Sequence, residues 1–406
     1  MKKVGIFFLL KAPKKFIIFL FADIFKKPYL YNMRVYKESP IRVLELFSGI
    51  GGMHYALSRT RNILTSELFD FKVIAAIDIS DIANKVYRYN FPETEHFGSN
   101  ICGLTAEKLN KWKIEAIFMS PPCQPFTRQG QQKDLKDSRT EPLVHLISLL
   151  PKIETLNYIL LENVKGFETS EACKLMIDML NKLSFDTKSF LLSPTQLGVP
   201  NSRLRYYLIA KRQSNISQGN EKNSILPEII TDPAQLHDVL PIIAETFLAN
   251  TEPNTLQKYL RCNPNSDKLL LSDSVLSKYG EILDIVKPSD KNCCCFTKSY
   301  GRYAEGTGSV LLQAGVLDST YHRAKQCDKN SDLYIEILKE LKLRYFHPYE
   351  IADLLGFPVK KDKVLLDGGN FEFPPEYDER TIHCYRVLGN SLNVTVVSFL
   401  SCLLFT

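Results

Sequence analysis

Apolar segments that read as strands alternate with helix-like segments from residue 41 to residue 211, and this alternation constrains the fold more than any other feature. The expected strands are 42–47, 73–77, 114–119, 158–161 and 205–210, and the main helical segments are 79–90, 143–150 and 171–183. Repeated β-α-β units of this length form a parallel sheet covered by helices on both faces. We therefore expect a doubly wound α/β domain that binds ligands at the carboxyl ends of its strands.

The alternation stops after residue 211, which indicates a second and smaller domain. Residues 212–292 are polar and irregular, 333–343 suit a short amphipathic helix, and the sequence turns apolar again over 385–399. A chain of 406 residues also exceeds the ~250–300 residues that one hydrophobic core usually supports. We expect an N-terminal extension at 1–40, a first domain at 41–211, a second at 212–380 and a C-terminal segment at 381–406.

The net charge comes from the N-terminal segment rather than from the body of the chain. Lysine and arginine exceed aspartate and glutamate by six, and residues 1–32, with seven lysines and one aspartate, supply all of this excess. From Met33 onward the chain is formally neutral, so net charge gives little support to a nucleic-acid partner. The apolar runs 4–10 and 16–25 are shorter than the ~20 residues of a membrane span. We expect no membrane segment, and Met33 is an alternative first residue that would leave 1–32 without a folded role.

The ten cysteines do not form a framework of spaced pairs, and a chain of this length does not need disulfides for stability. Cys293, Cys294 and Cys295 are consecutive, so their side chains diverge and cannot easily close one tetrahedral metal site. The sequence contains no C-x-x-C motif. We expect reduced thiols in a cytoplasmic or nuclear protein, and no bound metal.

A glycine-rich turn after the first predicted strand is a candidate cofactor site. The sequence Phe47-Ser48-Gly49-Ile50-Gly51-Gly52 opens a helix, where small residues let the backbone approach a ligand and the helix N-terminus offers free N–H groups. Asp78 ends the next strand, the usual place for an acid that accepts hydrogen bonds from ribose hydroxyls. Together they suggest an adenosine-containing cofactor, although glycines at such a position also serve simple tight turns.

A proline-rich loop after the strand at 114–119 presents a candidate nucleophile. In Ser120-Pro121-Pro122-Cys123-Gln124-Pro125-Phe126, three prolines within five residues fix the backbone at the carboxyl end of the strand. Most cysteines are small buried apolar residues. Cys123 is instead expected on a rigid loop over the cofactor crevice, a position that suits a nucleophile.

An acid and two arginines complete the candidate chemistry. Glu162 follows the apolar strand at 158–161, so its carboxyl can face the same crevice and act as an acid towards a ring nitrogen. Arg203 and Arg205 alternate along a strand, which places both guanidinium groups on one face. Two fixed donors could hold a carbonyl oxygen or a phosphate, whereas the alternative interpretation is a solvated basic strand end.

The order and spacing of these motifs resembles the C5-cytosine methyltransferase family. The shared stretches are 47–52, 121–123, 162–164, Arg203-x-Arg205 and the closing Gly389-Asn390-Ser391-Leu392-Asn393-Val394. The resemblance covers residues 41–397 except the middle of the second domain. It implies the Rossmann-like, mostly parallel fold of S-adenosylmethionine-dependent methyltransferases, a target-recognition domain at 212–380, and a C-terminal segment that returns to the cofactor pocket.

Within this family the chain is most similar to the branch called DNA methyltransferase two, whose characterised members methylate tRNA. The similarity rests on 125–128 with 137–140, on 295–301 and on 305–309, and the tripeptide Cys295-Phe296-Thr297 is the signature of the branch. The first 40 residues and the extra cysteines Cys293 and Cys294 depart from the family pattern. The resemblance implies C5 methylation of cytosine 38 in the anticodon loop of aspartate tRNA, and we expect a monomer.

The resemblance also implies roles for individual residues. Cys123 would attack C6 of the base, Glu162 would protonate its N3, and Arg203 and Arg205 would hold its carbonyl. The implied cofactor residues are Phe47, Ile50, Gly51, Gly52, Asp78, Ile101, Cys102, Ser120, Asn390 and Ser391. A polyanion would contact local basic clusters at 128–136 and 298–302. Two alternatives remain open: a DNA methyltransferase with the same chemistry, and a nucleic-acid-binding homologue that has lost catalysis.

Overall fold

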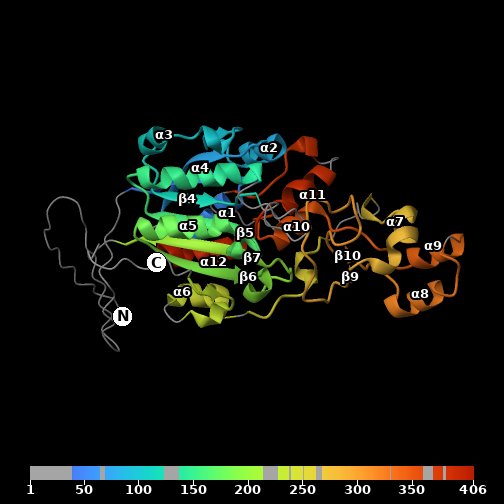
Figure 1. The fold of residues 1–406 in the computed structure, drawn as a ribbon. Coiled ribbons are helices and arrows are strands. Elements are labelled where there is room, and N and C mark those ends of the chain that lie inside the picture. Colours follow the sequence, from blue (N-terminus) through green and yellow to red (C-terminus); the bar gives the residue numbers. More distant parts are fainter. Residues whose placement is uncertain are drawn as a thin grey trace, which may run out of the picture.

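The computed structural model describes residues 39–64, 69–122, 137–213, 227–236, 239–249, 251–261, 268–329, 331–359, 369–377 and 381–406. Three expectations fall outside these residues: most of the N-terminal extension, the candidate nucleophile Cys123, and the basic cluster at 128–136. The described chain forms a sheet with helices on both faces, continued on one side by a lobe of short helices (Figure 1).

The first domain is organised by an eight-stranded sheet in the order β3-β2-β1-β4-β5-β7-β6-β8. The strands are β1 (Ile41–Leu46), β2 (Phe71–Ile77), β3 (His96–Phe97), β4 (Ala116–Met119), β5 (Tyr158–Val164), β6 (Phe185–Leu192), β7 (Arg205–Arg212) and β8 (Ile229–Ile230). Neighbouring strands are parallel except in the pairs β5–β7 and β7–β6. The expected doubly wound, mostly parallel sheet is confirmed, with β7 running against the other described strands.

Alternating side chains of the central strands fill a hydrophobic layer on each face of the sheet. Val43 of β1 belongs to the layer with α1 (Gly52–Leu64), α2 (Asp81–Asn90) and α12 (Val394–Phe405). Leu44, the next residue, belongs to the layer with α3 (Ala106–Lys111), α4 (Glu141–Leu149) and α5 (Glu171–Lys182). Both side chains are fully buried, as expected for a parallel sheet covered on two faces.

Three details of the sheet differ from the expectation. β6 was not predicted, because its exposed Asp186 and Lys188 make its first half too polar to read as a buried strand. β7 is antiparallel, because a short connection without a long helix joins it to β6, and such a connection favours antiparallel pairing. β5 continues to Val164, which places Glu162 inside the strand rather than after it.

The second domain consists of short elements. They are α6 (Pro241–Ile243), α7 (Asp273–Tyr279), β9 (Ile285–Val286), β10 (Val310–Leu311), α8 (Leu317–Ala324), α9 (Asp332–Lys339) and α10 (Pro348–Leu354). A separate hydrophobic cluster that includes Leu276, Ala324 and Leu338 joins α7, α8 and α9 into the lobe at the right of Figure 1. α9 corresponds to the helix expected at 333–343, whereas the domain boundaries stay predictions.

The C-terminal helices return to the first domain. α11 (Thr381–Gly389) leads through residues 390–393 to α12, which lies along α1, where Ser398 Oγ donates a hydrogen bond to the carbonyl of Ala56 at 3.3 Å. The span Thr381–Phe405 is long and apolar enough to cross a membrane, but 83% of its most apolar window is buried inside the fold. The hydrophobic core therefore accounts for its composition.

Candidate active site

A cavity of about 570 Å³ opens at the carboxyl ends of β1, β2, β4 and β5, where a doubly wound sheet binds its ligands. Its wall contains nine of the predicted site residues: Phe47, Asp78, Ile101, Ser120, Glu162, Arg203, Arg205, Asn390 and Ser391. Four others do not line it: Ile50, Gly51 and Gly52 are buried behind the turn, and Cys102 is exposed. Cys123 lies outside the described residues, but Pro121 and Pro122, which precede it, belong to the wall.

The turn after β1 has a backbone that favours small residues. Gly49 and Gly51 have φ angles of 53° and 85°, and a Cβ atom on Gly51 would lie 2.5 Å from the ring of Phe91. Phe47 also has a φ of 53°, although it carries a side chain, which costs about 1–2 kcal/mol. Ser120 Oγ donates a hydrogen bond to the carbonyl of Phe47 at 3.1 Å and so helps to hold this strained residue in the cavity wall.

Asp78 joins this turn to the end of β2. Its Oδ2 accepts a hydrogen bond from the N–H of Gly49 at 2.9 Å, and its Oδ1 accepts one from the N–H of Ser80 at 2.7 Å. Burial raises the pKa of the Asp78 carboxyl, and these two N–H groups partly oppose that effect. Each carboxylate oxygen has a second lone pair, so Asp78 can also accept hydrogen bonds from ligand hydroxyls.

Asn163 fixes the proline-rich loop to β5. Its Nδ2 donates a hydrogen bond to the carbonyl of Pro121 at 3.3 Å, and its Oδ1 accepts one from the N–H of Val164 at 2.8 Å. The Asn163 side chain is buried, so both contacts are protected from water. The middle residue of the 162–164 motif thus positions the segment that leads to Cys123.

Glu162, which is buried, forms an ion pair with the partly buried Arg205 across the antiparallel strands β5 and β7. Arg205 Nε lies 3.7 Å from Glu162 Oε1. Burial raises the pKa of Glu162, and the positive charges of Arg205 and Arg203 offset only part of that rise. A carboxyl with a raised pKa retains a proton more readily than an exposed glutamate, as donation to a ring nitrogen requires.

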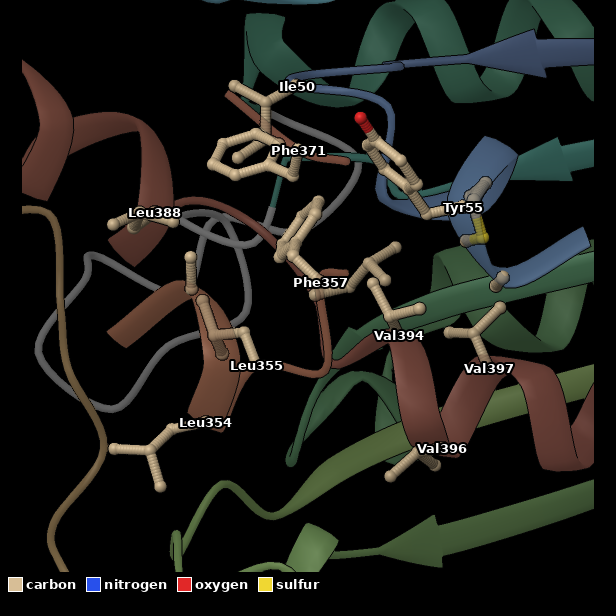
Figure 2. Close-up of a cluster of buried hydrophobic side chains, with 14 of the residues drawn as sticks. Ile50, Tyr55, Leu354, Leu355, Phe357, Phe371, Leu388, Val394, Val396 and Val397 are labelled. Carbon is tan, nitrogen blue, oxygen red and sulfur yellow. The ribbon is translucent and has the colours of Figure 1, made fainter. Parts of the chain in front are cut away.

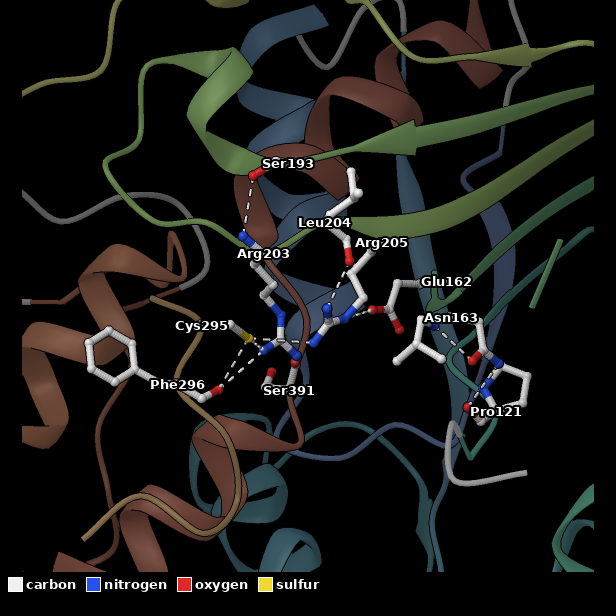
Figure 3. Close-up of polar contacts among 11 residues, drawn as sticks. Pro121, Glu162, Asn163, Ser193, Arg203, Leu204, Arg205, Cys295, Phe296 and Ser391 are labelled. Carbon is white, nitrogen blue, oxygen red and sulfur yellow. Dashed lines mark hydrogen bonds and ion pairs between the residues drawn. The ribbon is translucent and has the colours of Figure 1, made fainter. Parts of the chain in front are cut away.

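Arg203 connects segments that are far apart in the sequence (Figure 3). Its backbone N–H donates a hydrogen bond to Ser193 Oγ at 3.2 Å, and its Nη1 donates to Cys295 Sγ at 3.2 Å and to the carbonyl of Phe296 at 3.4 Å. Its Nη2 donates to the carbonyl of Ser391. Arg203 precedes β7, and it links the first domain to the second domain and to the C-terminal segment.

Cys295 is a partly buried neighbour of both arginines that was not among the predicted site residues. Arg205 Nη2 donates to the same sulfur as Arg203, at 3.6 Å, so the two guanidinium groups converge as their alternation predicted. Burial alone would raise the pKa of the Cys295 thiol, but the two arginines together lower it. The Cys-Phe-Thr signature was the available signal. Cys293 is buried and Cys294 is exposed, so the three consecutive side chains do diverge.

Several further cavity residues were not among the predicted site residues. They include Ile79, Ser80, Asn100, Arg139, Lys298 and Arg386. Lys298 belongs to the basic cluster expected at 298–302, and Arg386 precedes the closing motif by three residues. With Arg139 they add positive charge to a cavity whose own acids are few, which favours an anionic substrate.

Comparison with known proteins identifies the family. The family model described as C-5 cytosine-specific DNA methylase matches residues 41–402. The chain belongs to this family. Its members are C5-cytosine methyltransferases, which generally use S-adenosylmethionine as the methyl donor. The resemblance drawn from the motifs is therefore confirmed.

The relatives align over most of their length. The Spodoptera frugiperda protein named tRNA (cytosine(38)-C(5))-methyltransferase is 38% identical, over 90% of this chain and 99% of that protein. The Homo sapiens protein of the same name is 39% identical, with the same coverage of 90% and 99%. A Dictyostelium discoideum protein named DNA (cytosine-5)-methyltransferase is 36% identical, over 88% of this chain and 92% of that protein.

A comparison with solved structures finds proteins of the same kind. The crystal structure of a Spodoptera frugiperda DNMT2 mutant superposes with a TM-score of 0.73 at 38% identity, over 90% of this chain and 100% of that one. The methyltransferase fold expected from the sequence is thus confirmed by both sequence and structure.

Proposed function

We propose that this chain methylates C5 of cytosine 38 in the anticodon loop of aspartate tRNA, with S-adenosyl-L-methionine as the methyl donor, and that it acts as a monomer. The observation that carries the proposal is the placement of Glu162, Arg203 and Arg205 in one cavity with the segment leading to Cys123. The names of the Spodoptera and human relatives support tRNA as the substrate. Cys295, the first residue of the signature of the tRNA-methylating branch, accepts hydrogen bonds from both arginines.

The cavity fits S-adenosyl-L-methionine in size and in the chemistry of its wall. A volume of about 570 Å³ lies within the range of roughly 300–1,000 Å³ typical of small-molecule sites. Asp78 would accept hydrogen bonds from the ribose, and Ile101, with Cys102, would lie beside the adenine. The remaining proposed cofactor residues are Phe47, Ile50, Gly51, Gly52, Ser120, Asn390 and Ser391. When bound, the cofactor supplies an electrophilic methyl group.

The protein must activate C5 of cytosine, because this carbon is a poor nucleophile. In the proposed mechanism Cys123 attacks C6 as a thiolate, while Glu162 protonates or hydrogen-bonds N3, so that C5 gains enamine character. Arg205 pairs with Glu162 and, with Arg203, would hold the base carbonyl. Loss of the proton from C5 later breaks the bond between C6 and Cys123. The base must leave its stack to enter the cavity, which costs little in an anticodon loop.

DNA methylation by the same chemistry is the second candidate function. The name of the Dictyostelium relative favours it. The cavity residues described above act on the cytosine ring, which DNA and RNA share, so they support both substrates equally. The cytoplasmic and nuclear locations expected from the thiols stay predictions.

Transfer of label from tritiated S-adenosyl-L-methionine tests the proposal. The enzyme is offered tRNA and, separately, duplex DNA, and the labelled base is mapped. We expect label at position 38 of aspartate tRNA. Label on DNA alone would overturn the proposal in favour of the second candidate, and label on neither substrate would indicate a binding protein that has lost catalysis.

Replacement of the nucleophile tests the mechanism. The variant Cys123→Ala should lose methyl transfer completely, because no other group would form the bond to C6, but it should still bind S-adenosyl-L-methionine. Binding is measured by calorimetry and transfer by the tritium assay. Measurable turnover by this variant would refute the covalent scheme.

A further inference from the structure

A second cavity lies at the junction of the first domain with the second domain and the C-terminal helix. Its volume is about 590 Å³, and none of the described residues lines both this cavity and the active-site cavity. Its described walls come from α1, from the turn after β6, from residues 254–259, from the loop after α10 and from the start of α12. Figure 2 shows the wall residues Tyr55, Phe357 and Val394 together beside the hydrophobic core.

Arg59 of α1 brings a positive charge to this wall. Its Nη1 donates a hydrogen bond to Thr395 Oγ1 at 2.9 Å, and its guanidinium carbon lies 5.6 Å from the centre of the Phe247 ring. Within the described ranges, no carboxylate pairs with Arg59, and its Nε and Nη2 groups donate no hydrogen bond. Burial lowers the pKa of Arg59, which reflects the cost of holding this charge away from water. An anion in the cavity would reduce that cost.

The rest of the described wall combines a few polar side chains with aliphatic and aromatic ones. Lys258 supplies a second cation and Asp353 one carboxylate, so the three charged residues of the described wall carry one net positive charge. The amide of Asn62 can both donate and accept hydrogen bonds. The aromatic wall residues are Tyr55, Tyr259 and Phe357.

We propose that this second cavity binds a nucleoside monophosphate, whose base packs against the aromatic wall and whose phosphate accepts hydrogen bonds from Arg59. Nε and Nη2 of a guanidinium present two parallel N–H donors, a geometry that matches two phosphate oxygens. The rings and the Asn62 amide suit a heteroaromatic base. The methyl donor of the active site has no phosphate group, so the two cavities select different molecules.

Binding at this place would join parts of the chain that are separate in sequence. Arg59 belongs to the helix that begins at the cofactor turn, Lys258 to the second domain and Thr395 to the C-terminal helix. A ligand that contacts all three stabilises the second domain against the first. The site therefore acts on domain orientation and takes no part in methyl transfer.

The test is a titration of the full-length protein with the active-site cavity saturated by S-adenosylhomocysteine, so that an adenosine group cannot bind there. Adenosine monophosphate should bind and raise the melting temperature. Adenosine lacks the phosphate and inorganic phosphate lacks the ring, so each should bind at least about tenfold more weakly. Calorimetry gives the affinities and scanning fluorimetry the melting temperatures. Equal binding of adenosine and adenosine monophosphate, or no binding of the monophosphate, overturns the proposal.

Matched variants locate the site. Arg59→Met should weaken binding of adenosine monophosphate at least about tenfold, and Arg59→Lys should retain part of it. Arg61→Met is the control on the same helix, because Arg61 pairs with Asp70 and does not line the cavity. If Arg59→Met does not fold, Asn62→Leu, an exposed position in the same wall, should still weaken binding. Wild-type affinity in these cavity variants overturns the proposal.

Discussion

The candidate site contains charged side chains that are buried next to one another. Glu162 is 8% exposed and Arg203 is 4% exposed. A charge at this depth is strongly destabilising without a partner, so the carboxyl and the two guanidinium groups stabilise one another. Removing one of them affects both folding and chemistry, and an isosteric neutral replacement separates the two effects best.

Glu162→Gln should slow methyl transfer about 10²–10⁴-fold, because an amide cannot donate the proton that N3 requires. Since Glu162 must be protonated to act, the wild-type rate should also decline as pH rises through its raised pKa, and the variant should lose this decline. Single-turnover rates on tRNA across a pH series measure both effects. Glu154→Gln, at an exposed position, is the control, and a variant rate close to that of wild type would contradict the assigned role.

Glu45 of β1 makes stability depend on pH. It is fully buried, Tyr87 donates a hydrogen bond to its Oε2 at 2.8 Å, and burial raises its pKa to about 8. In the unfolded chain the pKa is about 4.3, so between these two values the native state binds more protons and stability falls as pH rises. Glu45→Gln should flatten this fall. Urea denaturation at several pH values measures it, and equal slopes for variant and wild type would rule the effect out.

The end of helix α11 packs closely against the backbone of residues 297–298 in the second domain. A Cβ atom on Gly389 would clash with the backbone carbon of Thr297 and the backbone nitrogen of Lys298. Lys298 lines the active-site cavity, so this contact sets part of the cavity wall. The glycine is needed here for close approach of two backbones.

Gly389→Ala should therefore move the 297–298 segment and lower kcat/KM about tenfold or more, with a loss of stability of about 1–3 kcal/mol. Gly103→Ala is the control, since a Cβ atom there would meet nothing within 4 Å. Steady-state kinetics and thermal denaturation measure the two effects. Unchanged kinetics in Gly389→Ala would show that the segment adapts without cost.

The second domain is held by a buried ion pair at the start of α10. Arg344 Nη1 and Nη2 lie 2.8 and 2.9 Å from the two carboxylate oxygens of Glu350, which also accept hydrogen bonds from the N–H groups of Arg261 and His347. Arg344 is 5% exposed and Glu350 is 1% exposed. This pair joins the strand-like segment before α10 to the loop at residue 261.

Glu350→Gln should lower the free energy of unfolding by about 3–5 kcal/mol, because it leaves the Arg344 guanidinium buried without its counterion. Glu340→Gln removes the partner of an equally close pair with Arg323 on the surface, and it should change stability little. Guanidinium chloride denaturation compares the two variants. Similar losses in both would mean that burial does not decide the strength of these pairs.

Across the whole molecule, the features that could be predicted from the sequence are those that depend on local patterns, such as strands and the residues at their ends. Phe47 ends a predicted parallel strand, and Asp78 and Ser120 each directly follow one, so locating the strands was enough to bring these residues to one edge of the sheet. Glu162 was placed correctly at the same edge, although its strand is longer than expected.

Features that depend on distant parts of the chain could not be predicted in this way. Nothing local to Arg203 indicates that its guanidinium contacts Cys295, which is 92 positions away in the sequence. The second cavity likewise exists only where α1, the loop after α10 and α12 meet. Such contacts follow from tertiary packing, which periodicity and motif spacing do not encode.

Translation order gives the bond between Arg203 and the carbonyl of Ser391 a biological meaning. Ser391 lies 188 positions after Arg203, so a ribosome must synthesise all of the intervening second domain before this partner exists. A prematurely terminated product would contain every motif up to Arg205 and still lack the carbonyl and the helix α12 that hold those motifs in place. The contacts that hold Arg203 in the cavity wall are therefore complete only after the C-terminal segment has been synthesised.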